Sequence, residues 1–153
     1  MARFTNPVTI EDIDAVVKEI PYTLQGGTTG AGAVQPTFNG SPLFYGSYTK
    51  TGNLVHFRVN VQMTNITNFG AGQYYVTLPD GISEYDVYVR NGHLQHSSGD
   101  TYSISGHATG GTNILKLYST ASNGKEVPFT HTVPVGLNAS CHFHIFGSFF
   151  AAP

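Results

Sequence analysis

The chain has little charge, a single cysteine and no tryptophan. Of its 153 residues only 10% are Asp, Glu, Lys or Arg, and the formal net charge is −2 at pH 7. This near balance excludes the long-range attraction that marks most nucleic-acid binders. The single cysteine, Cys141, excludes an intrachain disulfide, and its place in an apolar alternation indicates a small buried residue.

Long apolar runs are also missing. No segment approaches the ~20 apolar residues of a membrane-spanning helix, and the residues after Met1 lack the apolar stretch of a secretory signal. We therefore expect a protein without a membrane span that is made in a cytoplasm.

Glycine and aromatic residues are abundant instead. The chain contains 18 glycines, eight prolines, nine tyrosines and ten phenylalanines. This composition is typical of an all-β protein with many turns. A chain of this length also buries enough surface to fold around one core without a metal or a disulfide.

The segment from Tyr45 to Pro79 carries the clearest pattern. Between Leu54 and Met63 apolar and polar residues alternate, which predicts a half-buried strand with Phe57 and Val59 inward and Arg58 outward. A turn at 51–53 pairs this strand with a strand over 46–50, and a third strand over 73–78 ends before Pro79.

Further short strands with turn residues between them follow. We expect strands over 84–90, 102–107, 113–120, 130–135 and 139–150, with a hairpin turn at Asn91-Gly92. Strands at this spacing without helices between them predict an antiparallel two-sheet β-sandwich, jelly-roll-like, over residues 41–153.

Residues 1–40 have a different sequence pattern from the strands that follow. Thr9 to Ile20 is typical of an amphipathic helix that Pro21 ends. Leu24 to Gly40 is typical of a flexible or extended arm that takes no part in the core. The apolar stripe of this helix would pack on its own sandwich, on copies of itself around a symmetry axis, or on a larger particle. Its members are the candidate attachment and oligomerisation residues Ile10, Ile13, Val16, Val17 and Ile20.

Sites for chemistry are sparse. His142 and His144 lie two residues apart on one predicted strand, so both imidazoles face the same side and are candidate metal ligands. Two ligands do not complete a metal site. No serine, histidine and carboxylate pattern indicates a hydrolase, and no glycine cluster lies between a strand and a helix to hold phosphate. The sequence therefore predicts no catalytic residues and no cofactor.

Two motifs carry a resemblance. The segment GSYTKTGNLV at 46–55, followed by FGAGQYYVTLP at 69–79, resembles β-sandwich modules of bacteriophage virion structural proteins, such as tail fibres, head fibres and capsid decoration proteins. The resemblance implies a non-enzymatic virion protein, a homotrimer that is anchored to capsid or tail proteins by its N-terminal segment. It also implies that His-x-His pairs gathered around a trimer axis could bind iron, as in some phage fibre and spike proteins.

A second class of function stays open. Strand tyrosines such as Tyr45, Tyr48 and Tyr88 could serve as stacking platforms for sugars, which predicts a receptor- or glycan-binding module of a fibre tip. The same tyrosines could instead border the core or a subunit interface. The absence of tryptophan favours this second interpretation.

Overall fold

The computed structural model describes residues 19–81 and 83–153, which form twelve strands and, within those two ranges, no α-helix. All pairings are antiparallel. The all-β antiparallel class predicted from the sequence is confirmed. The strands are β1 (Ile20–Tyr22), β2 (Gly26–Val34), β3 (Thr37–Phe38), β4 (Leu43–Thr51), β5 (Leu54–Gln62), β6 (Ile66–Asn68), β7 (Ala71–Thr77), β8 (Val87–Gln95), β9 (Thr101–Ala108), β10 (Ile114–Thr120), β11 (Glu126–Pro128) and β12 (His142–Phe150).

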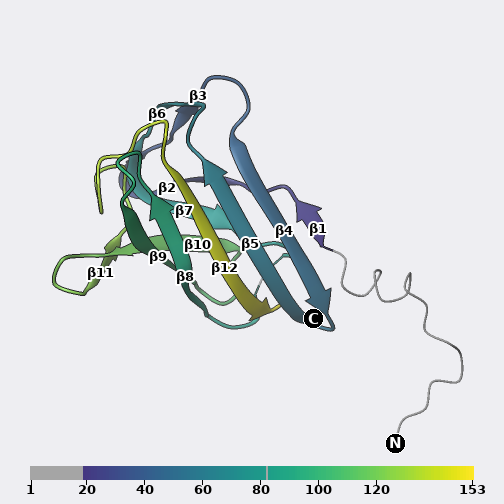
Figure 1. Ribbon diagram of the computed structural model, residues 1–153. Coiled ribbons are helices and arrows are strands. Elements are labelled where there is room, and N and C mark those ends of the chain that lie inside the picture. The colour runs from purple at the N-terminus through teal and green to yellow at the C-terminus, as the bar shows by residue number, and fades with distance from the viewer. Residues whose placement is uncertain (1–18, 82) are drawn as a thin grey trace, which may run out of the picture.

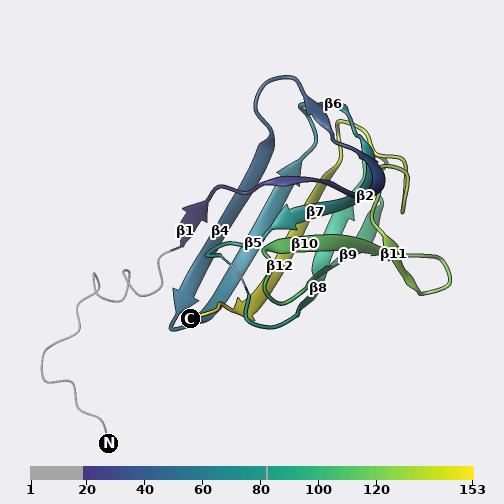
Figure 2. The ribbon, with the colours of Figure 1, turned by 180° about the vertical axis from the view of Figure 1, so that it is seen from behind.

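One curled sheet contains most of these strands. Its order is β1-β4-β5-β12-β8-β9-β10-β7-β2 with β11 paired to β10, while β3 and β6 form a small second sheet. Figures 1 and 2 show that the sheet curls until β2, β7 and β10 lie behind β4, β5 and β12. The result is an open half-barrel, and the expected jelly-roll connectivity stays a prediction.

The two edges of the sheet are neighbours in the sequence. β1 and β2 stand at opposite ends of the strand order, yet only residues 23–25 separate them in the chain. The connection crosses the open side of the half-barrel, where Tyr22 donates a hydrogen bond to the carbonyl oxygen of Thr77 on β7 at 2.9 Å. Leu24 within this connection is buried. The curl therefore brings the two edges of the sheet close enough for residues 23–25 to connect them.

The core fills the inside of the curl. On β5 the side chains of Phe57 and Val59 are 4% and 1% exposed while Arg58 faces solvent, so the predicted register is confirmed. Cys141 is buried with a free thiol, as expected. The other buried apolar residues are Leu24, Val55, Val61, Met63, Tyr74, Val76, Leu78, Val87, Val89, Leu94, Ile104, Ala108, Leu115, Leu117, Phe129, Phe143, Ile145, Phe149 and Ala151.

The structure corrects the part of the N-terminal prediction that falls within the described residues. The predicted helix over 9–20 lies outside the described residues except for its end, and that end is wrong because Ile20 begins strand β1. Ile20 pairs with Tyr48 of β4, so its backbone hydrogen bonds go to the sheet instead of a helical turn. No helix among the described residues has the length and apolar character needed to cross a bilayer.

The predicted flexible arm over 24–40 is also wrong. Residues 26–29 of β2 pair with β7, and Thr28 is 3% exposed. The side-chain amide of Gln35 bonds the Thr28 backbone on both sides, with Oε1 accepting from its N–H at 3.0 Å and Nε2 donating to its carbonyl oxygen at 2.6 Å. Gly26 and Gly27 allow close packing, since a Cβ on Gly27 would overlap the Gln35 side chain, whereas Gly30, Gly32 and Gly40 have positive φ and open space around them.

Two predicted details of the C-terminal half are corrected. Asn91-Gly92 is not a hairpin turn, because β8 runs through it with an irregularity between Val89 and Gly92. Gly92 serves a close approach instead, since a Cβ there would lie 2.7 Å from the carbonyl oxygen of Ile104. The predicted strand over 130–135 is a loop, folded back by a hydrogen bond from the Thr130 N–H to the Val133 carbonyl oxygen at 3.0 Å.

Candidate functional site

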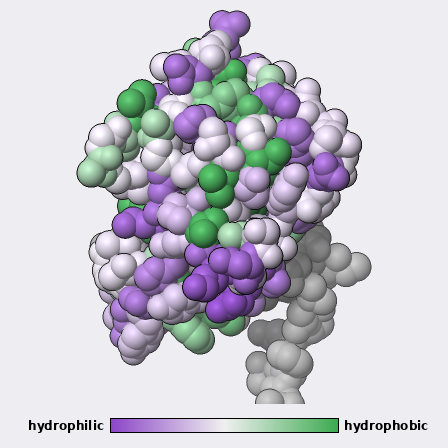
Figure 3. All heavy atoms as spheres, turned by 90° about the vertical axis from the view of Figure 1, so that its left-hand side faces the viewer, coloured by the Kyte–Doolittle hydropathy of each residue, from purple (hydrophilic) through white to green (hydrophobic). Residues whose placement is uncertain are grey.

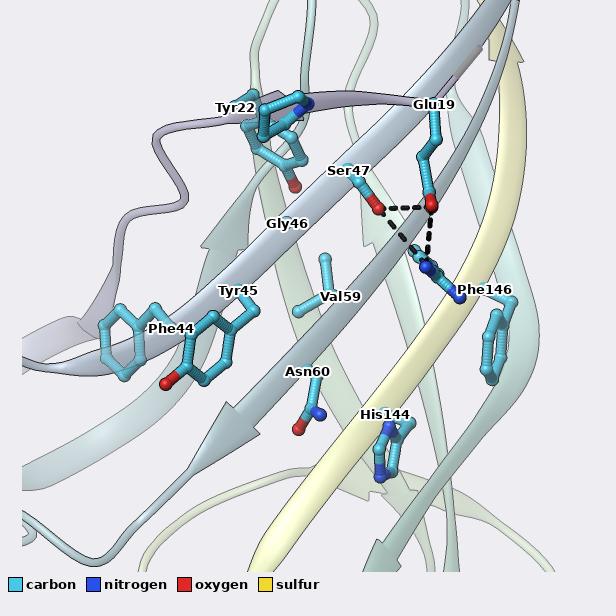
Figure 4. Close-up of a pocket in the computed structure, with 12 residues that line it drawn as sticks. Glu19, Tyr22, Phe44, Tyr45, Gly46, Ser47, Val59, Asn60, His144 and Phe146 are labelled. Atoms are coloured by element: carbon cyan, nitrogen blue, oxygen red, sulfur yellow. Dashed lines mark hydrogen bonds and ion pairs between the residues drawn. The ribbon is translucent and has the colours of Figure 1, made fainter. Parts of the chain in front are cut away.

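A groove runs over the outer face of β4, β5 and β12 and encloses about 610 Å³ (Figure 4). A shallower depression of about 410 Å³ continues it and shares part of its wall. We call the first of these the outer groove. The outward-facing residues of its lining include Glu19, Tyr45, Ser47, Arg58, Asn60, His144 and Phe146.

Strand register places these side chains. In the β4–β5 hairpin Tyr45 pairs with Asn60, and across β5–β12 Asn60 pairs with His144. Neighbouring positions on paired strands carry their side chains on the same face. The alternation that buries Val59 therefore presents Asn60 and its cross-strand partners to the outside.

An ion-pair network closes one wall of the outer groove. Arg58 donates to Glu19, with Nη2 to Oε2 at 2.7 Å and Nε to Oε1 at 2.6 Å. Ser47 links the pair, because its hydroxyl donates to Glu19 Oε1 at 2.5 Å and accepts from Arg58 Nε at 3.2 Å. All three groups face solvent, so the network orients side chains more than it stabilises the fold.

Two aromatic rings stand exposed in the outer groove. Tyr45 is 53% and Phe146 is 45% exposed. Between their strands, the side-chain oxygen of Asn60 is buried without a hydrogen-bond partner. Elsewhere, on the side that carries β11, apolar side chains lie among polar ones (Figure 3). Rings beside amide and imidazole groups give the outer groove both apolar contact and hydrogen-bonding capacity.

Three histidines gather at one end of this face, on β12 and β8. The ring centroids of His142 and His144 are 5.3 Å apart, and those of His93 and His144 are 5.1 Å apart. We call these three residues the histidine row. The pKa of His144 is lowered from its ordinary value, first because the imidazole is partly buried and then because His93 and His142 repel its charge.

The predicted metal ligands thus have a neighbour that the sequence did not suggest. His142 and His144 share a face of β12 as expected, and His93 joins them because it pairs with His144 across β8 and β12. Even so, within residues 19–81 and 83–153 no group of three or more His, Cys, Asp or Glu side chains is arranged to hold a metal ion.

A second polar cluster lies on β8 and β9. The Tyr88 ring stacks on His107 at 4.5 Å, and His107 Nε2 lies 3.4 Å from Asp86 Oδ2. The pKa of Asp86 is lowered, first by a hydrogen bond from the Gly110 N–H and then by His107. This cluster supports the loop at Gly110, and its carboxylate already has partners.

The predicted attachment residues lie mostly outside the described ranges. Ile10, Ile13, Val16 and Val17 fall within residues 1–18, and only Ile20 is described, on β1 with 42% of its surface exposed. Their proposed role therefore stays a prediction.

The sequence reasoning missed the outer groove. The alternation and the turn at 51–53 already implied that Tyr45 lies beside Asn60 and Ser47 beside Arg58, so this part was available from register alone. The contribution of Glu19 could not be predicted from register, because the sequence pattern places this residue in a helix. Predicting the positions of Phe146 and His93 requires the order of strands in the sheet, which the sequence does not reveal.

Comparison with known proteins gives a likeness to a solved structure. No family model matches the chain, and no curated protein sequence matches it. The chain is similar to the crystal structure of the Dettilon tailspike protein, with a TM-score of 0.57 and 16% sequence identity over 86% of this chain. It spans 23% of the tailspike chain, so the likeness concerns the fold of less than a quarter of that protein.

Proposed function

We propose that this chain is a non-enzymatic structural protein of a bacteriophage virion, a component of the tail. The observation that carries the proposal is the fold shared with part of a tailspike protein over 86% of the chain. The GSYTKTGNLV segment, at the turn between β4 and β5, and the FGAGQYYVTLP segment, which contains β7, support the same class of protein from the sequence. A tailspike belongs to a tail, so the likeness favours a tail component over a capsid decoration protein or head fibre.

A role without catalysis agrees with the chemistry of the outer groove. Hydrolysis of a glycosidic bond generally uses two carboxyl groups across the bond. Among the described residues that line the outer groove, Glu19 supplies the carboxylate, and Arg58 and Ser47 already bind both of its oxygens. This arrangement suits binding better than acid-base chemistry.

The mode of assembly is part of the proposal. We expect a homotrimer that is attached to other virion proteins through residues 1–20, with Ile10, Ile13, Val16, Val17 and Ile20 as the apolar contacts. Exposed rings such as Tyr85 and Phe150, 65% and 57% exposed, are suited to contacts between copies. The protein would be made in the host cytoplasm and then reside in the virion.

Purified particles test this assignment. Quantitative mass spectrometry of phage particles that encode the chain should find it in a fixed ratio to the tail proteins, and cryo-electron microscopy should locate the half-barrel on the tail. Detection only in the lysate, and never in banded particles, would overturn the virion assignment. Light scattering of the purified protein should report a trimer, and a monomer at micromolar concentration would exclude the trimer.

A second candidate is a receptor- or glycan-binding module. The observation that favours it is the outer groove, where the exposed rings of Tyr45 and Phe146 border the polar groups of Asn60 and His144. Sugar rings stack on such faces while amides and imidazoles bond their hydroxyl groups. A glycan array should show selective binding that Phe146→Ala abolishes and Tyr88→Ala, on another part of the sheet, leaves intact. A flat array would contradict the sugar-binding candidate.

A further inference from the structure

The histidine row is a place where positive charge can appear without a compensating carboxylate. His93, His144 and His142 lie within 5.1 and 5.3 Å of their neighbours, measured between ring centroids. None of the three imidazoles has a hydrogen bond to another group among the described residues. As far as residues 19–81 and 83–153 are concerned, their nitrogen atoms are available to a bound molecule.

The groups around the row are almost all neutral. Next to His144 lies Asn60 on β5, and beyond it Tyr45 on β4. On the other side His93 pairs with Ser103 of β9. His142 lies between Gln62 and Gln95.

The charged groups nearest to the row are the Arg58–Glu19 pair and Asp100, and none of them forms an ion pair with a histidine of the row. Arg58 binds Glu19 on the wall of the outer groove. Asp100, just before β9, accepts a hydrogen bond from the Ser98 hydroxyl at 2.7 Å. Protonation of the row thus creates local positive charge that has no ion-pair partner among residues 19–81 and 83–153.

We infer that the histidine row is an anion subsite of the outer groove, which binds the carboxylate or phosphate groups of an acidic saccharide and does so more tightly as the pH falls. This inference deepens the sugar-binding candidate above and rests on it. His144 lines the outer groove together with Phe146, so a saccharide stacked on that ring reaches the row with its acidic group. Protonated imidazoles donate from both nitrogens and attract the anion.

The lowered pKa of His144 fits this role. In the free protein His144 resists protonation, first because its imidazole is partly buried and then because His93 and His142 repel its charge. A bound anion removes that repulsion, so ligand binding and proton uptake strengthen each other. Affinity for an anion must then rise through the range in which the imidazoles become charged.

Three soluble oligomers of similar length provide the test by titration calorimetry at pH 7.5 and 5.5. They are an oligomer of galacturonic acid, an oligomer of glycerol phosphodiester and a neutral galactose oligomer. The charge of the first two is constant over this range, so any change belongs to the protein. We expect the affinity for an anionic oligomer to rise about tenfold at pH 5.5, and the affinity for the neutral oligomer to stay unchanged. A gain with one anionic oligomer alone identifies carboxylate or phosphate as the group recognised.

Variants locate the effect. The double variant His93→Gln with His144→Gln should lose the rise in affinity for the anionic oligomers at pH 5.5. His56→Gln, on the outer face of the sheet but outside the row, should keep it. His93→Arg should bind the anionic oligomer tightly at both pH values, because its charge is permanent. The Arg variant keeps the test informative if the double variant folds poorly.

Two outcomes would overturn the inference in distinguishable ways. If the anionic and neutral oligomers bind equally at both pH values, the outer groove binds sugar and the row is not an anion subsite. If the anionic oligomers do not bind at pH 5.5 at all, the subsite is excluded, and the glycan array alone decides the sugar-binding candidate.

Discussion

The hydroxyl of Tyr22 donates a hydrogen bond to the carbonyl oxygen of Thr77 at 2.9 Å, 55 positions away in the sequence. Tyr22 is in the edge strand β1, and Thr77 ends β7, next to the other edge. Burial of the phenol raises the pKa of Tyr22, so the group stays a neutral donor at any physiological pH. This bond joins the two ends of the curled sheet.

Removing that hydroxyl should loosen the half-barrel. Tyr22→Phe keeps the ring but leaves the Thr77 carbonyl without this donor, which should lower the free energy of unfolding by about 1 kcal/mol. Urea denaturation measures the difference. Tyr45→Phe is the matched control, because Tyr45 is 53% exposed, and it should be nearly neutral. Equal effects of the two changes would contradict a structural role for the Tyr22 bond.

The core of β5 should dominate stability over its outer face. Phe57 is 4% exposed and its ring packs edge-on against Phe149 at 5.9 Å, so Phe57→Ala should cost about 3–5 kcal/mol. Arg58→Ala removes a solvent-exposed ion pair with Glu19 and should cost less than about 1 kcal/mol. Urea melts of both variants give the comparison, and the reverse order would refute the register of β5.

Gly92 should be intolerant of any side chain. A Cβ there would meet two backbone carbonyl oxygens, at 2.7 Å from that of Ile104 and 3.1 Å from that of His144, and neither strand can move freely. Gly92→Ala should therefore destabilise the protein by about 1–3 kcal/mol and lower its Tm by several degrees. Gly136→Ala is the control, since nothing lies within 4 Å of its Cβ position. A Tm of Gly92→Ala equal to that of the control would show that β8 adapts.

Acid should weaken the free protein slightly through His144. Because the pKa of His144 is lowered in the folded state, the unfolded chain binds its proton first as the pH falls. The free energy of unfolding is therefore unaffected by His144 above the ordinary histidine pKa of about 6.5. It declines as the pH falls from there toward the lower pKa that His144 has in the folded protein. His144→Gln should reduce the loss of stability between pH 7.5 and 5.0, by less than about 1 kcal/mol because the ring is partly exposed. Urea midpoints at the two pH values provide the measurement, and an unchanged difference would argue against this origin.

The attachment role of the N-terminal segment can be tested separately from folding. Deletion of residues 1–18 spares β1 and the Glu19 network, so the half-barrel should keep its circular dichroism spectrum and Tm. The same deletion should abolish co-sedimentation with particles that lack the protein. Ile13→Asp with Val17→Asp should do the same in the full chain, because an apolar interface would have to bury two carboxylates. Normal co-sedimentation of the double variant would exclude these residues as the anchor.

Much of the fold was predictable where one face of a strand is buried. Alternation predicted β5, and its inward positions Phe57 and Val59 are buried as expected. A strand was also predicted where β12 lies, and there Phe143 and Ile145 are buried. The period of a half-buried strand is a strong signal, since a slip of one residue would reverse its faces.

Prediction failed where glycine serves packing instead of a turn. Gly27 in β2 and Gly92 in β8 lie within strands that approach other groups closely, but their sequences are typical of an arm and of a hairpin turn. Only part of the candidate site could be predicted from the sequence. Register within the β4–β5 hairpin is local and places Tyr45 beside Asn60, whereas the contact of His93 with His144 depends on which distant strands become neighbours.

The position of β1 also determines how the domain would carry tension. A pull on the N-terminal segment enters the sheet at Ile20, and three residue pairs hold β1 to β4. Next along the chain are the Tyr22–Thr77 hydrogen bond and three hydrogen bonds between Gln25 and Thr77, at 2.9, 3.0 and 3.4 Å. The strands that bear the outer groove are joined over nine residue pairs on each side of β5. Under load we expect the short edge strand β1 to separate from β4 first, while the strands that bear the outer groove keep their alignment.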